Sequence, residues 1–152
     1  MKDFFQNKAN EKDLEEILNN PIVKRYNRQT VIQNINFLFS NGATKEDILY
    51  SPLVLSSKPI NLLIKFALCE QEGISIHTFL RKRLFMASAS HLYAQIEFFK
   101  SRLVRGERMV EGLINFDKRW TLNEDIYSTY ILDDEKKEKI LDFQLENFNE
   151  LC

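Results

Sequence analysis

Apolar residues recur along the chain at the spacing of an α-helix. Steps of four and then three residues, which bring side chains onto one helical face, occur in three successive segments of the 152-residue chain. They are Val31, Ile35 and Leu38, then Leu62, Phe66 and Cys69, and then Leu92, Ile96 and Phe99. The β-branched residues follow this helical spacing rather than the alternation of a half-buried strand. The pattern predicts an all-α fold.

A longer period runs through the same region. Glu16–Pro21 is followed 31 residues later by the similar segment Asp47–Pro52, and after a further 31 by Thr78–Arg83, in which arginine replaces the proline. Gly42 and Gly73 are also 31 residues apart, and each follows a helical segment that a residue of positive φ would cap. We therefore expect a short right-handed array of about three 31-residue helical repeats over residues 11–105.

Each repeat is expected to contain a short helix, a turn and a longer helix. Asp13 and Thr44 each stand three residues before an acid, which is typical of a helix N-cap. After residue 106 the period fades, and residues 106–152 are expected to form capping helices with an acidic end. The length suits a single domain over residues 1–152.

The second repeat carries Pro52, Leu55, Leu62 and Cys69, at one step of three residues and two steps of seven. In this it resembles the motif of the mitochondrial transcription termination factor (mTERF) family. In that family a proline in a short turn is followed by a leucine three residues later and by apolar residues at seven-residue steps. The first repeat matches at Pro21, Val31 and Leu38, with Lys24 in place of the leucine; the third has Arg83, Met86, Tyr93 and Lys100. The resemblance implies a curved helical array that binds DNA or RNA along a basic concave surface.

Charge is segregated along the chain although the net charge is only -1. Residues 81–119 carry 9 basic and 4 acidic side chains, whereas residues 120–152 carry 3 and 9. Equivalent turns of stacked repeats would align along one edge, so basic residues there are expected to contact nucleic-acid phosphates. These candidates are Lys24, Arg25, Arg28, Arg81, Lys82, Arg83, Arg102 and Arg105. Tyr26, Tyr93 and Trp120 are candidates for stacking on bases.

The same residues also have a purely structural interpretation, in which the charges cover a solvated helix face and the aromatic rings lie in the core. The sequence contains no motif for a catalytic site, a metal or a nucleotide cofactor. Cys69 lies on the apolar face of a predicted helix, where a buried small hydrophobe is expected rather than a nucleophile. We therefore expect no enzyme activity, no metal and no cofactor.

Location is constrained by the apolar stretches and the cysteines. The longest apolar stretch, Ile60–Cys69, is interrupted by polar residues and is shorter than the roughly 18 residues of a membrane span, so no membrane association is expected. The N-terminal residues lack the apolar core of a signal peptide. Two cysteines make no disulfide framework, which favours a reducing, cytoplasmic compartment.

Two classes of function fit this sequence better than an enzyme. The first is a regulatory factor that binds DNA or RNA through the basic turns. The second is a protein-interaction module, or a small inhibitor of a nucleic-acid-handling machine, that holds a partner protein on its helical face. The side chains expected near such a face are Phe85, Met86, Leu92 and Phe116.

Overall fold

The fold was obtained as a computed structural model, which describes residues 10–115 and 124–151. Side-chain surroundings are described for residues 10–115 and 126–142. Within these ranges all regular structure is helical and no strand is present. The predicted all-α class is confirmed.

The helices follow a recurring order along the chain. A short α-helix, a 3-10 helix and a longer α-helix occur in succession three times, and further helices follow. The first unit contains α1 (Glu11–Leu18), η1 (Val23–Arg25) and α2 (Arg28–Ser40). The second contains α3 (Lys45–Tyr50), η2 (Pro52–Ser56) and α4 (Pro59–Glu70). The third contains α5 (Ile76–Arg81), η3 (Leu84–Met86) and α6 (Ala89–Ser101). The remainder contains α7 (Glu107–Ile114), α9 (Glu124–Thr129) and α10 (Asp134–Leu151).

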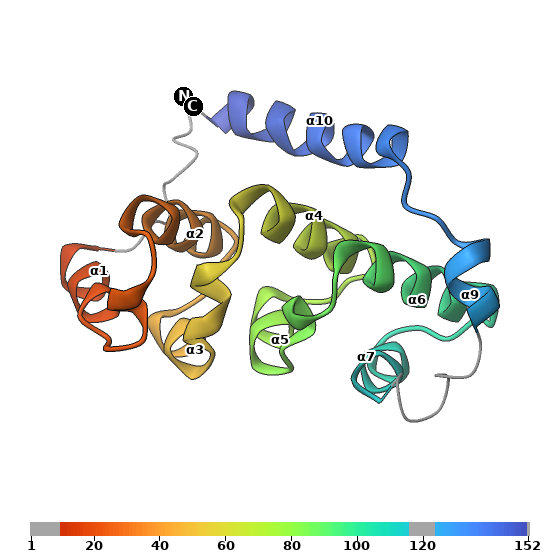
Figure 1. Cartoon of the computed structure of the whole chain (residues 1–152), viewed down its shortest axis with the longest axis horizontal. Coiled ribbons are helices and arrows are strands. Elements are labelled where there is room, and N and C mark those ends of the chain that lie inside the picture. The colour runs from red at the N-terminus through yellow and green to blue at the C-terminus, as the bar shows by residue number, and fades with distance from the viewer. Residues whose placement is uncertain (1–9, 116–123, 152) are drawn as a thin grey trace.

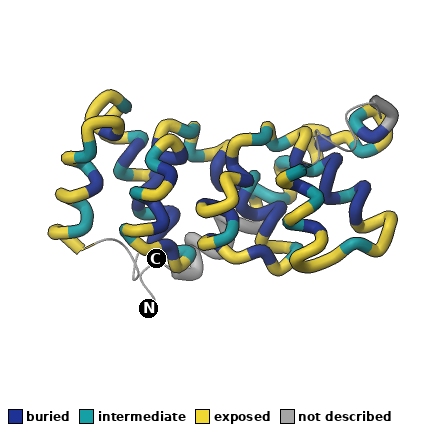
Figure 2. The backbone as a smooth tube through the Cα atoms, turned by 90° about the horizontal axis from the view of Figure 1, so that it is seen from below, coloured by how far each residue is buried: buried dark blue, intermediate teal, exposed yellow. Residues whose placement is uncertain are grey.

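The helices form layers (Figure 1). The short helices α1, α3, α5 and α7 lie in one row, and the longer helices α2, α4 and α6 lie in a second row beside it. Helix α10 crosses the long helices on the side away from the short ones and packs on α4. Figure 2 shows that buried residues line the inner sides of the rows while exposed residues line the rim.

The long helices end in the same way in all three units. A residue of positive φ follows each helix, and the next amide donates a hydrogen bond back to a carbonyl in the last turn, which is the Schellman arrangement. The residues of positive φ are Gly42 (94°), Gly73 (77°) and Leu103 (60°). The bonds run from Ala43 N to Leu38 O (3.0 Å), Ile74 N to Cys69 O (3.1 Å) and Val104 N to Phe99 O (2.9 Å).

Helices α1, α3 and α5 are fixed at their N-terminal ends by polar side chains. Thr44 accepts a hydrogen bond from the Asp47 amide and Asp47 accepts one from the Thr44 amide, which makes the reciprocal capping box predicted there. The predicted cap at Asp13 is wrong, because α1 begins three residues earlier, where Asn10 accepts from the Asp13 amide. Asn10 has the same capping chemistry as an aspartate and comes first in the chain.

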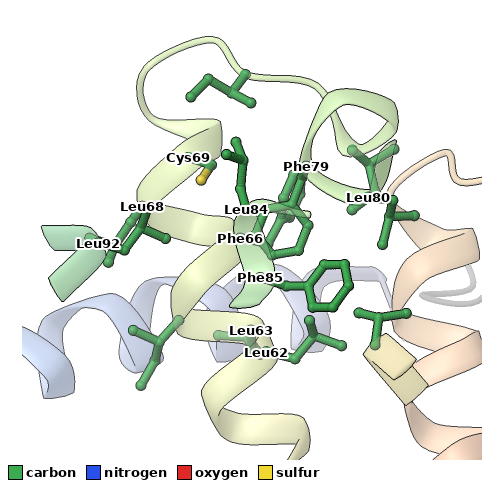
Figure 3. Close-up of a cluster of buried hydrophobic side chains, with 14 of the residues drawn as sticks. Leu62, Leu63, Phe66, Leu68, Cys69, Phe79, Leu80, Leu84, Phe85 and Leu92 are labelled. Carbon is green, nitrogen blue, oxygen red and sulfur yellow. The ribbon is translucent and has the colours of Figure 1, made fainter. Parts of the chain in front are cut away.

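Aromatic rings join the units through the core (Figure 3). Phe66 of α4 makes edge-to-face contacts with Phe37 of α2 at 6.3 Å and with Phe79 of α5 at 5.3 Å between ring centroids. Phe79 in turn lies 6.1 Å from Phe85 of η3. Cys69 is fully buried in the same cluster, and burial raises the pKa of its thiol to about 12. Its role there is that of a small hydrophobic side chain.

Candidate nucleic-acid interface

A polar side chain on each long helix holds the segment that follows it. Asn34 of α2 is fully buried, and its Nδ2 donates to the carbonyls of Leu55 (3.1 Å) and Ser57 (2.8 Å) in and after η2. Lys65, 31 residues later in α4, donates from Nζ to the Phe85 carbonyl of η3 at 3.0 Å. Gln95, a further 30 residues on, donates from Nε2 to the Tyr127 hydroxyl of α9 at 3.2 Å. The first two sets of bonds fix η2 and η3 against the preceding long helices, and the third holds α9 against α6.

The turns form one edge of the molecule, which we call the turn edge and define as residues 22–28, 51–58 and 82–88. This edge contains the 3-10 helices together with the N-terminal ends of α2, α4 and α6. Helices η1 and η2 contact each other. Because the N-terminal end of a helix carries partial positive charge, three such ends on one edge favour an anionic partner there.

The turn edge carries cations and no acids. The stretches 17–44, 48–69 and 74–96, which include the whole edge, contain no aspartate or glutamate. The cations on the edge are all exposed, and they are Lys24, Arg25, Arg28, Lys58, Lys82 and Arg83. Lys82 also lines a neighbouring hollow that contains Glu72, Glu107 and Glu111. The other five cations have no acid within these stretches, so their field adds along the edge.

Arg81 has a structural partner on the neighbouring short helix. Its Nε donates to Asp47 Oδ1 of α3 at 2.9 Å, and its guanidinium lies over the Tyr50 ring, 4.8 Å from the centroid. Asp47 Oδ2 accepts from His77 Nδ1 as well. Burial raises the pKa of Asp47, but the hydrogen bonds from the Thr44 amide, Arg81 and His77 outweigh burial and lower this pKa to about 2. Arg81 therefore ties α5 to α3.

Arg102 and Arg105 lie at the opposite end of the long helices from the turn edge. They follow the C-terminal end of α6, and a helix of 13 residues is about 20 Å long. Lys100 at that end contacts Glu72 (3.6 Å) and Glu97 (3.5 Å), so this region mixes both signs of charge. Arg102 itself lies over the Phe98 ring at 5.1 Å. The structure does not bring these two arginines to the other predicted phosphate contacts.

A groove runs across the turn edge and takes side chains from all three units. We call this hollow of about 240 Å³ the turn groove. It is lined by Ile22, Tyr26, Ser51, Pro52, Leu53, Arg83, Phe85 and Met86. Three of these are large apolar side chains that face solvent, with exposed fractions of 47% for Ile22, 45% for Leu53 and 57% for Met86. The groove is thus apolar and lies among the cations of the edge.

The three stacking candidates do not gather at one place. Tyr26 lines the turn groove and is half-buried. Tyr93 is half-buried in α6, and Lys136 in the first turn of α10 places its Nζ 5.2 Å from the centre of that ring. Trp120, like Phe116, is outside the described residues. Of the described candidates, Tyr26 alone lies on the turn edge.

Several residues of this site were not singled out in the sequence. Lys58, Ile22 and Leu53 belong to the turn edge because equivalent turns lie side by side. Two signals in the sequence point to them. One is the absence of acids from the three stretches around the turns, and the other is the recurrence of a polar residue at positions 34, 65 and 95 of otherwise apolar helix faces.

Among residues 10–115 and 126–142 no group of three His, Cys, Asp or Glu side chains is placed to hold a metal ion. No helix within residues 10–115 and 124–151 has the length and apolar character needed to cross a bilayer.

Comparison of the chain with protein-family models, with curated proteins and with solved structures finds no match. The resemblance to the mTERF family therefore stays a prediction, carried by the residues of the second repeat.

Proposed function

We propose that the chain is a helical-repeat protein, built from three copies of one unit, that binds nucleic acid through the turn edge. The observation that carries this proposal is the set of six exposed cations on an edge whose flanking stretches contain no acid. A molecule with a net charge of -1 gains no long-range attraction to a polyanion from its total charge. Local segregation of charge supplies that attraction.

Binding at this edge would work through phosphates. Lys24 and Arg25 lie in η1 and Arg28 begins α2, while Lys82 and Arg83 precede η3. A nucleic-acid backbone that follows the edge would exchange its condensed counterions for these side chains, so affinity would fall steeply with salt. Contacts to phosphates set register and give affinity without sequence preference. A regulatory role is consistent with such a small binding protein.

The test compares two charge reversals of equal size on opposite edges. Lys24→Glu with Arg25→Glu alters the turn edge, and Arg102→Glu with Arg105→Glu changes the net charge by the same amount at the other end of the long helices. We expect fluorescence anisotropy at about 50 mM salt to show at least a ten-fold weaker affinity for the first variant and a small change for the second, because phosphate contacts are local. An equal loss of affinity in both variants, or no binding by the unaltered chain, would overturn the proposal.

A protein partner is the second candidate, and a different hollow favours it. Between α5 and α7 lies a space of about 460 Å³, lined by Thr78, Lys82, Glu107, Val110 and Ile114 among others. Ile114 is 46% exposed there, and the three acids Glu72, Glu107 and Glu111 make the hollow unsuitable for phosphates. This function would be supported by a stoichiometric protein that co-purifies after nuclease treatment and is lost with Ile114→Asp.

A further inference from the structure

The side chains of the turn groove indicate which form of nucleic acid fits the turn edge. Its exposed apolar side chains Ile22, Leu53 and Met86 come one from each unit. They lie beside Arg83, which lines the same groove, and near Lys24 and Arg25 of η1. An edge that only followed phosphates would gain nothing from three large apolar groups in solvent.

An undeformed duplex has little use for these side chains. Its outer surface is sugar-phosphate backbone and its grooves present base edges, while the base faces stay stacked. An apolar side chain therefore reaches a base face only by partly unstacking a base step, which costs free energy. Apolar groups pressed against that backbone would displace water from phosphates without replacing its hydrogen bonds. The cations could still attract a duplex, but the apolar groups would keep it from a close fit.

A single strand can use both parts of the edge. Its bases are free to leave the backbone, and each has a face that packs on aromatic and apolar side chains. The Tyr26 ring and the apolar side chains line the groove, while exposed cations lie on the same edge. The charge of the edge complements the backbone, and the groove complements the bases.

We infer that the turn groove receives the bases of a single-stranded RNA or DNA segment, against Tyr26, Leu53 and Met86, while Lys24, Arg25 and Arg83 contact its phosphates. This inference rests on the proposed function, since it specifies the form of nucleic acid bound at the same edge. It assigns Leu53 and Met86, which carry no charge, a direct role in binding. It also makes the interaction tolerant of sequence, because every base offers an apolar face.

The first test compares the binding of two forms of nucleic acid that have the same composition. A labelled mixed-sequence single strand and a hairpin duplex of equal nucleotide number are each titrated with the full chain at about 50 mM salt. We expect the single strand to bind at least ten-fold more tightly. If both forms bind equally well, and the variant with Lys24→Glu and Arg25→Glu still binds more weakly, this inference is overturned and the proposed function stands. No binding of either form would overturn both.

The second test separates base contacts from charge. Leu53→Ala and Tyr26→Leu leave every charge in place, and each is expected to weaken single-strand binding about five-fold or more while duplex binding stays the same. Ile131→Ala, another exposed apolar side chain that lies between α9 and α10, is the matched control and should have no effect. Leu53 is half-exposed, so thermal unfolding of its variant should be close to that of the original chain.

An amphipathic acidic peptide would satisfy the same surface by different chemistry. If such a peptide binds with a dependence on Leu53 while single strands bind no better than duplexes, the groove belongs to a protein partner and the inference is wrong. If single strands show the dependence on Leu53 and Tyr26 and the peptide does not, the inference is supported.

Discussion

Leu103 stands where the first two units have glycine, and Leu103→Gly should stabilise the protein. Leu103 has φ 60°, in the left-handed region, and follows α6 as Gly42 and Gly73 follow α2 and α4. A non-glycine residue in this conformation costs about 1–2 kcal/mol. Glycine offsets about 0.5–1 kcal/mol of the gain from relieving this strain, because it has more freedom in the unfolded chain and loses it on folding. Leu103 is 78% exposed, so removal of its side chain loses little burial.

The net expectation is a gain of about 0.5–1 kcal/mol in the free energy of unfolding, which for a chain of this size raises Tm by a few degrees, about 2–4 °C per kcal/mol. Denaturant unfolding followed by circular dichroism measures this gain. The reciprocal change is Gly73→Ala, and no atom lies within 4 Å of the added Cβ. Its loss of about 1 kcal/mol would therefore come from φ 77° and not from a clash.

The reasoning would be refuted if Leu103→Gly lowered the free energy of unfolding, or if Gly73→Ala left it unchanged. The first result would mean that α6 does not end as α2 and α4 do, and the second that the positive φ of Gly73 carries no cost for a side chain. Gly112→Ala provides a contrast, because its Cβ would lie 2.5 Å from the Phe99 ring and the loss there would come from packing between α7 and α6.

Three further predictions concern two contacts between units and the burial of Cys69. Asp47→Asn should lower the free energy of unfolding by about 2 kcal/mol at neutral pH. The pKa of Asp47 in the folded chain, about 2, lies below the ordinary 3.8, so its stabilisation is complete above about pH 4 and is lost as the pH falls towards 2. Urea unfolding should therefore show the free energies of unfolding of the two proteins converging over that range. Asn34→Leu leaves the Leu55 and Ser57 carbonyls without this donor and should cost about 2–4 kcal/mol in the same assay, and a neutral result would contradict the bond. Cys69 should resist alkylation in the folded chain and react after denaturation, as read by peptide mass spectrometry, and rapid native labelling would contradict its burial.

The parts of the fold that sequence could predict depend on local physics. The spacing of Leu62, Phe66 and Cys69 defines one face of α4, and the Thr44 capping box marks the start of α3; both follow from residues within one turn or one helix. The local sequence does not separate the two candidate caps of α1, because Asn10 and Asp13 are both capping residues and lie three residues apart, within one turn.

The parts of the site that sequence could not predict depend on distant contacts. Arg81 belongs to Asp47, 34 residues away on another helix, and nothing in the local sequence separates it from its basic neighbours Lys82 and Arg83. The positions of Arg102 and Arg105 depend on the length and direction of α6, which carry them away from the turn edge. The turn groove exists only once three separate turns are brought together.

The account is tested most directly by mapping where a nucleic acid touches the chain. We expect amide chemical shifts recorded by NMR, during titration of the isotope-labelled chain with a mixed-sequence single strand, to change in residues 22–28, 51–58 and 82–88. The amides of residues 40–43, 71–75 and 102–105, at the far end of the long helices, should stay unchanged. Shifts confined to that far end, or the absence of any shift at the turns, would contradict the turn edge as the binding surface.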